Sequence, residues 1–157
     1  MTVTPMSIEE DINQQKFFSP KQKATINVIY TFNYLDGGLK CIVKAHDILP
    51  QHFNILKILK GAHPNPVTPG VLLDVMLDKT RDLTRLTNKL VKMGWVVRKA
   101  NEDNRRSMLI SLTEKGLRRT IEIEEEVNEW ILNNVHLPDG ECEKLSNLLD
   151  NLRESQR

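Results

Sequence analysis

The sequence predicts a mainly α-helical fold with one small β hairpin. Residues 78–93 have the apolar spacing of an amphipathic helix, and Gly94 is placed to end it. Residues 95–99 and 108–112 have strand character and are joined by the polar turn 101–106. A helix followed at once by a hairpin is the order of pieces in a winged helix-turn-helix. The expected fold is therefore a winged helix-turn-helix core with a small β wing, flanked by N- and C-terminal dimerisation helices.

The N-terminal part predicts one long helix. Residues 1–18 look poorly structured or form a short helix from Ser7. Ser19 followed by Pro20 is a favourable helix start, since Ser caps the N-terminus and Pro fits the first helical position. The pair Gly37-Gly38 is expected to bend or interrupt this helix, because glycine is costly in a helix interior.

The central part predicts two further helices and a loop. Leu49-Pro50 marks a helix start, and Gly61 marks its end. Residues 63–70 contain three prolines and form a loop that can offer Val67 and Thr68 to a small sheet. A short helix over 70–77 is expected to follow.

The helix over 78–93 divides into two faces, with Asp78 expected as its N-cap. One face is apolar and is predicted to be buried; it consists of Leu83, Leu86, Leu90 and Met93. The opposite face is polar and cationic, and consists of Arg81, Thr84, Arg85, Asn88, Lys89 and Lys92.

The C-terminal part predicts two more helices. Thr113 can cap a helix that runs to about Asn134, and Pro138 opens the last one. A winged core of this size is marginal alone, and the end helices carry apolar stripes without an obvious cover, which favours a two-fold dimer over end helices that pack on their own core. The expected divisions are an N-terminal extension (1–18), an N-terminal dimerisation region (19–48), the winged core (49–113) and C-terminal dimerisation helices (114–157).

Charge is concentrated in the winged core. The whole chain has 22 Lys and Arg against 21 Asp and Glu, but residues 79–112 hold nine basic and three acidic groups, and residues 113–157 hold six basic and eleven acidic groups. A nearly neutral protein with one basic block can hold a polyanion in one place. A solvated basic helix face explains the charge equally well.

Other classes of function find no support in the sequence. Four histidines and two cysteines show no metal-ligand spacing, and no phosphate-binding glycine loop or nucleophile elbow is present, so neither an enzyme nor a cofactor is expected. No apolar run is long enough for a bilayer, and the acidic, polar start is unlike a signal peptide, so we expect a cytoplasmic protein without membrane partners. Cys41 and Cys142 are interpreted as free thiols, with redox sensing by Cys41 the less favoured alternative.

Three segments resemble the MarR family of bacterial transcriptional regulators. LPQHFNILKILKG (49–61) is similar to the helix after the family's first dimerisation helix. DKTRDLTRLTNKLVKMGWVVRK (78–99) resembles its recognition helix and first wing strand, and DNRRSMLISLTEKG (103–116) its wing turn and the following elements. The likeness extends from about Ser19 to Leu152.

The resemblance implies roles for particular residues. Thr84 and Arg85 match the recognition-helix pair that enters the major groove. Arg105 matches the wing arginine, which reaches the minor groove or its phosphates, and Asp103 matches the acid that braces it. Pro69-Gly70 and Asp82 depart from the family pattern, and Asp82 leaves the exact set of base contacts open. The expected DNA-contact set is Lys79, Thr80, Arg81, Thr84, Arg85, Asn88, Lys89, Arg105 and Arg106.

The expected function is a double-stranded DNA-binding transcriptional regulator, a repressor that binds a palindromic operator as a homodimer. The resemblance also implies release by a small-molecule effector, for which Tyr30, Tyr34, Phe53 and Trp130 could line a pocket, although plain core is the more favoured interpretation of these four residues. The alternative function is a winged helix used only to bind other proteins. The cationic helix face argues against that alternative.

Overall fold

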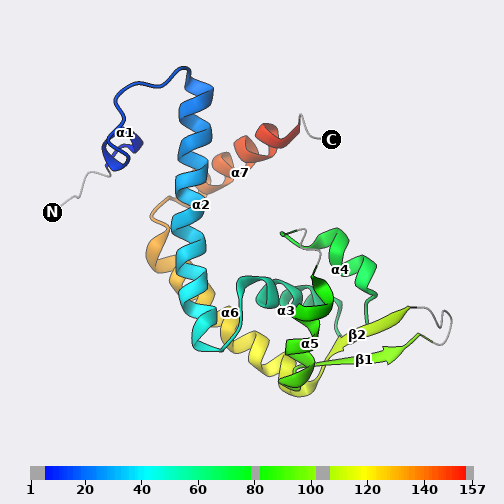
Figure 1. Ribbon diagram of the computed structural model, residues 1–157. Helices are drawn as coiled ribbons and strands as arrows, with labels where there is room; N and C mark the ends of the chain where they lie inside the picture. Colours follow the sequence, from blue (N-terminus) through cyan, green and yellow to red (C-terminus); the bar gives the residue numbers. More distant parts are fainter. Residues whose placement is uncertain (1–5, 79–81, 102–106, 155–157) are drawn as a thin grey trace.

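The computed structural model describes residues 6–78, 82–101 and 107–154, and contains seven helices and two strands in these ranges (Figure 1). In chain order they are α1 (Ile8–Asp11), α2 (Pro20–Ala45), α3 (Pro50–Ala62), α4 (Pro69–Val75), α5 (Leu83–Lys92), β1 (Val96–Ala100), β2 (Met108–Leu112), α6 (Glu114–Asn134) and α7 (Asp139–Arg153).

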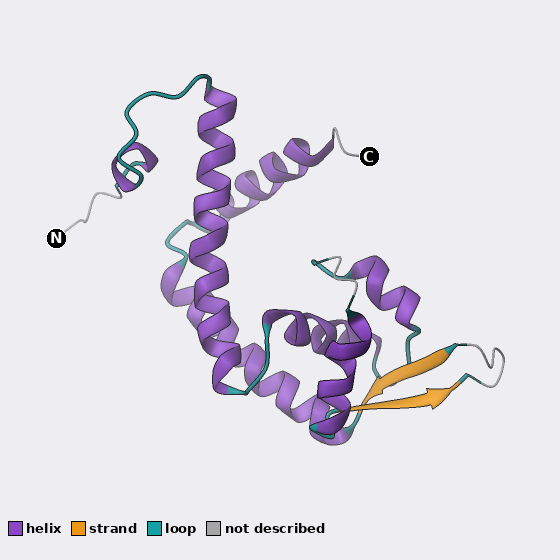
Figure 2. Cartoon of the chain, viewed as in Figure 1, coloured by secondary structure: helices purple, strands orange, loops and turns teal. Residues whose placement is uncertain are grey.

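The chain has two parts, a winged core and a helical arm. Helices α3, α4 and α5 gather beside the β1–β2 hairpin, while α2 and α7 form the arm, and α6 runs from the core into the arm (Figures 1 and 2). Strands β1 and β2 pair antiparallel, with Val96 opposite Leu112 and Ala100 opposite Met108. This arrangement confirms the predicted fold class, a winged helix-turn-helix between terminal helices.

A short third segment extends the hairpin. Val67 pairs with Ile110 through two backbone hydrogen bonds of 2.9 and 2.8 Å, as the sequence predicts for Val67. Thr68 does not continue the strand. Its hydroxyl instead accepts a hydrogen bond from the backbone N–H of Val71 and caps α4, so the sheet stops where the helix begins.

The hydrophobic core lies inside the winged part and holds α5 in place. The most deeply buried side chains come from α3, α4, α5, α6 and both strands: Ile55, Leu56, Leu59, Leu72, Leu90, Val96, Ile110 and Ile123. Each such side chain contributes roughly 1.5–3 kcal/mol by leaving water. The core thus fixes the rotation of α5 about its own axis.

Helix α5 begins later than the sequence predicts. Asp82, not Asp78, is its N-cap, because the Asp82 carboxylate accepts a hydrogen bond from the backbone N–H of Arg85. The Asp78 carboxylate accepts from the Gln51 side chain at 3.2 Å instead. The end of the helix is as predicted, since Gly94 has a φ of 71°, a left-handed conformation that glycine adopts without a Cβ clash.

Helix α2 starts as predicted, with Ser19 as N-cap and Pro20 as the first residue. The expected interruption at Gly37-Gly38 was wrong, because α2 continues through both residues to Ala45. Gly38 has a packing role: a Cβ there would overlap the indole ring of Trp130 on α6. Glycine at this position lets α2 and α6 approach closely, whereas a Cβ on Gly37 would meet no atom within 4 Å.

Helix α6 is attached to both parts of the chain. Thr113 caps it as predicted, with its hydroxyl accepting from the Gly116 N–H at 2.9 Å and donating to the Gly94 carbonyl at 2.7 Å. Further along the helix, the Glu124 carboxylate forms ion pairs with Lys57 and Lys60 of α3. The core and the arm are therefore joined through one continuous helix.

The arm leaves much apolar surface uncovered. Helix α2, all of whose residues are described, buries only Val43, and the equally complete α7 buries none. Exposed apolar side chains on α2, α6 and α7 include Val28, Ile29, Phe32, Leu35, Ile131, Leu132, Leu145, Leu148 and Leu152. Within residues 6–78, 82–101 and 107–154, no helix has the length and apolar content needed to cross a membrane.

The close approach at Gly38 gives a first prediction. Gly38→Ala should lower the free energy of unfolding by about 1–3 kcal/mol, because the added methyl group displaces the Trp130 ring. Gly37→Ala is the matched control and should raise it by about 0.5–1 kcal/mol, since alanine favours the helix and meets nothing. Urea unfolding measures both variants, and equal effects of the two substitutions would show that the α2–α6 contact is not tight.

Candidate nucleic-acid interface

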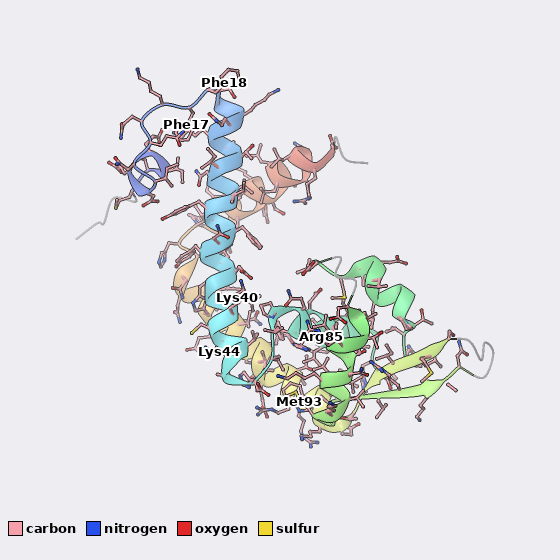
Figure 3. All side chains as sticks on the ribbon, in the orientation of Figure 1. Phe17, Phe18, Lys40, Lys44, Arg85 and Met93 are labelled. Carbon is pink, nitrogen blue, oxygen red and sulfur yellow. The ribbon has the colours of Figure 1, made fainter. Side chains whose placement is uncertain are left out.

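The exposed face of α5 carries the described part of the predicted contact set. Thr84, Arg85, Asn88 and Lys92 are exposed and Lys89 is half-buried. The opposite face is buried and consists of Leu83, Leu86, Thr87 and Leu90. Figure 3 shows Arg85 on this helix. The structure therefore brings these polar and cationic side chains together on the outer face of one helix, as predicted.

Arg85 is oriented by the residue that caps its helix. The Arg85 side chain is 70% exposed, and its Nε contacts the Asp82 carboxylate Oδ2 in an ion pair. Since this contact uses Nε, the outer guanidinium nitrogens remain at the exposed end of the side chain. Asp82 thus supports Arg85, and its acidic charge, which departs from the family pattern, is balanced locally.

Lys89 is paired with a residue of a different element. Its ammonium group lies 3.0 Å from the Asp47 carboxylate, at the corner between α2 and α3. Asp47 has a φ of 57°, a left-handed conformation that aspartate tolerates better than most residues. Lys40, Lys44 and Lys89 line one hollow, together with Leu49. Figure 3 shows Lys40 and Lys44 near the end of α2.

Arg98 of β1 is a site residue that the sequence interpretation missed. Its Nη1 donates to the Asn88 side-chain Oδ1 at 2.7 Å, and its Nη2 donates to the Thr84 carbonyl at 3.1 Å and to the Thr87 hydroxyl. Strand alternation places Arg98 on the same side of β1 as the buried Val96, which was the signal available in the sequence. The wing strand is thus bonded directly to the exposed face of α5.

His52 lies buried beneath the same face. Its Nδ1 accepts a hydrogen bond from the Leu49 backbone N–H at 2.9 Å. Burial lowers the pKa of His52 from 6.5 to about 4, and the charges of Lys89 and Arg85 lower it as well, while Asp47 opposes them. His52 also lines a groove of about 560 Å³ along α5, together with Leu49, Arg85, Asn88, Lys89 and Lys92.

The base of the wing is closed by hydrogen bonds between Asn101 and Ser107. The backbone N–H of Asn101 donates to the Ser107 carbonyl at 3.1 Å, and the Asn101 side chain donates to the Ser107 hydroxyl at 3.1 Å. Six predicted site residues lie outside the described residues: Lys79, Thr80, Arg81, Asp103, Arg105 and Arg106.

The four aromatic residues expected near a ligand do not form one pocket. Tyr30 and Tyr34 line a cavity of about 420 Å³ between α1 and α2. The Tyr34 and Trp130 rings lie 6.1 Å apart between centroids and pack α2 against α6. Phe53 belongs to the core of the winged part. Cys41 is exposed and Cys142 is half-buried, and both are free thiols; among the described residues, no three potential ligands gather as a metal site.

An exposed cationic helix followed by a β hairpin, on a core that fixes the helix rotation, defines the winged-helix class of nucleic-acid-binding proteins. Residues 52–116 match the family described as "Winged helix DNA-binding domain". These residues contain most of α3, all of α4 and α5, both strands and the start of α6.

Several known proteins are similar to this chain. The transcriptional repressor MprA of Escherichia coli K12 is 29% identical over 75 residues, which are 48% of this chain and 43% of MprA, so the match spans less than half of that relative. The crystal structure of a MarR transcription factor from Planctomyces limnophilus is 26% identical, with a TM-score of 0.68, over 86% of this chain and 98% of that one. The structure of reduced AbfR bound to DNA has 17% identity and a TM-score of 0.70 over 87% and 91% of the two chains.

The winged core therefore matches the winged-helix DNA-binding family, and the fold of the chain is similar to that of a MarR transcription factor.

The lowered pKa of His52 predicts a loss of stability in acid. The unfolded chain takes up a proton near pH 6.5, whereas the folded chain resists it until about pH 4, so stability falls as the pH falls through this window. At pH 5 this loss should reach about 2 kcal/mol. His52→Gln can keep the hydrogen bond to the Leu49 N–H but does not titrate. Unfolding by urea at pH 7 and pH 5 should show a smaller pH dependence for the variant, and equal dependence would contradict the assignment.

Proposed function

We propose that this protein binds double-stranded DNA sequence-specifically and regulates transcription, acting as a repressor on a palindromic operator. The observation that carries the proposal is the exposed cationic face of α5, with Arg85 extended from it and Lys89 and Lys92 beside it. An α-helix fits the major groove, where each base pair presents a distinct set of hydrogen-bonding groups. Arg85 can donate to guanine through two nitrogens, whereas lysines suit phosphates.

The wing completes the proposed interface. The turn 102–106 joins the two strands in sequence and carries Arg105 and Arg106, and arginine is the residue preferred in narrow minor grooves. Asp103 would brace Arg105, as the family resemblance implies. AbfR, a relative of the same fold, is known in a structure bound to DNA, which supports the same activity here.

The arm supports a homodimer as the DNA-binding form. Helices α2 and α7 expose apolar side chains, such as Phe32, which is 62% exposed, and Leu148, which is 65% exposed. Almost none of the residues of these two helices is buried. Monomeric proteins rarely leave contiguous apolar surface of this kind uncovered. A two-fold dimer would cover it and would present two α5 helices to successive major grooves, the arrangement that reads a palindrome.

The proposal also includes a small-molecule effector whose binding releases the protein from DNA. The cavity lined by Tyr30 and Tyr34 has the volume of a small-ligand site, and it lies against α2, the helix that would pair with a second copy. The alternative function, a winged helix that binds only proteins, would leave the cationic face of α5 without a purpose.

DNA binding should depend on Arg85 and on salt. Arg85→Ala is expected to weaken binding to a selected duplex by about 5- to 150-fold, because a major-groove arginine contact contributes about 1–3 kcal/mol. Affinity of the wild type should fall linearly with the logarithm of salt concentration, as phosphate neutralisation requires. Fluorescence anisotropy with duplexes selected from a random pool measures both effects.

Arg118→Ala is the matched control for charge, since Arg118 is an exposed arginine on α6 and not on α5. It should change the affinity little. If the wild type selects no duplex from the pool and instead captures a partner protein, the alternative function is correct.

The proposed dimer should dissociate when the arm carries a charge. Leu148→Glu, on α7, should shift the protein from dimer to monomer in sedimentation velocity, since an unpaired carboxylate would be buried between subunits. Val75→Glu is the control, because Val75 is 55% exposed on α4, within the winged part. A wild type that sediments as a monomer at every concentration would refute the dimer.

A further inference from the structure

The hydrogen bond between Arg98 and Asn88 fixes which way the Asn88 amide faces. A guanidinium group has donors and no acceptor, so the amide atom that it contacts at 2.7 Å must be the carbonyl oxygen Oδ1. The Asn88 NH₂ group therefore points away from Arg98. Asn88 is exposed on the outer face of α5, whereas Arg98 is half-buried on β1.

Arg98 is itself held firmly by the helix. Its Nη2 donates to the Thr84 carbonyl at 3.1 Å and to the Thr87 hydroxyl, while Nη1 holds Asn88. The Thr87 hydroxyl is buried and donates in turn to the Leu83 carbonyl at 2.8 Å. Three partners on one helix determine the position of the guanidinium, so the positive charge beside Asn88 Oδ1 has a fixed place.

This arrangement changes what Asn88 can recognise. A free asparagine pairs with adenine by accepting from the N6 amino group through Oδ1 and donating to N7. With a guanidinium at Oδ1, a base amino group would approach a positive charge, and the carbonyl is already engaged. The outward NH₂ group favours guanine, through N7 and O6, or thymine, through O4. Adenine also presents an acceptor, N7, but places its N6 amino group next to it, toward the Arg98 charge.

We propose that Arg98 is a specificity-determining residue that acts through Asn88, so that the base pair facing Asn88 is read as guanine or thymine and not as adenine. The inference rests on the proposed function, because it assigns a role to a wing residue within DNA recognition. Arg98 is a positioning residue that need not touch DNA.

The experiment begins with the full chain and a random duplex pool. The wild type and Asn88→Ala are each used for selection, and the position whose base preference is lost in Asn88→Ala is the base pair that Asn88 faces. Four duplexes that differ at this base pair are then measured by fluorescence anisotropy with the wild type, Arg98→Met, Arg98→Lys and Lys99→Met.

The matched control is Lys99→Met. Lys99 is the next residue of β1 and is exposed on the other side of the strand. Its substitution by Met removes the same single charge as Arg98→Met. Thermal unfolding of each variant verifies that it is folded, and Arg98→Lys, which keeps a charged donor near Asn88, provides a second folded variant.

The wild type should bind the guanine or thymine duplex at least about fivefold more tightly than the adenine duplex. This is the lower end of the preference that one base contact through hydrogen bonds provides. Arg98→Met should lose or reverse this preference, Arg98→Lys should retain part of it, and Lys99→Met should retain all of it while losing affinity for all four duplexes equally.

Three results would overturn the inference alone: a wild-type preference for adenine at this base pair, an unchanged preference in Arg98→Met, or no position that depends on Asn88. A wild type that selects no duplex would overturn the proposed function, and the inference with it.

Discussion

The lengthwise division of α5 into a buried and an exposed face is the constraint on which the interface depends. Leu86 and Leu90 are almost fully buried, and a rotation of the helix by one residue would bring them toward water at a cost of several kcal/mol. This cost holds Arg85 and Asn88 outward. The position of the polar side chains is therefore set by the apolar ones, through the core formed with α3 and the hairpin.

Neighbouring residues then adjust the exposed face. Asp82 orients Arg85, Asp47 pairs with Lys89, and Arg98 turns the amide of Asn88. The two ion pairs are largely exposed, so they contribute little to the free energy of unfolding. The ion pairs instead orient the Arg85 and Lys89 side chains. They also compete with other anions, because Asp47 must release Lys89 before Lys89 can pair with a phosphate. The cap of α5, the α2–α3 corner and β1 each supply one of these partners.

The arm and the core are coupled through α6. This helix of 21 residues is about 30 Å long, begins against the hairpin at Thr113 and packs Trp130 against Gly38 of α2. Ion pairs of Glu124 with two lysines of α3 hold its middle. Helix α6 is thus the element that connects the arm, where the dimer is proposed, to the core that carries α5.

Local patterns in the sequence determined the fold class, the two faces of α5 and its end at Gly94, because apolar periodicity and glycine conformation are properties of neighbouring residues. Long-range packing decided the rest. Asp82 caps α5 in place of the predicted Asp78, because the Asp78 carboxylate accepts from Gln51 whereas the Asp82 carboxylate accepts from the Arg85 backbone N–H. The need for glycine at position 38 comes from a ring 92 residues away, at Trp130, and the contact between Arg98 and Asn88 depends on how a strand packs against a helix. Such contacts join residues whose proximity only the folded core creates.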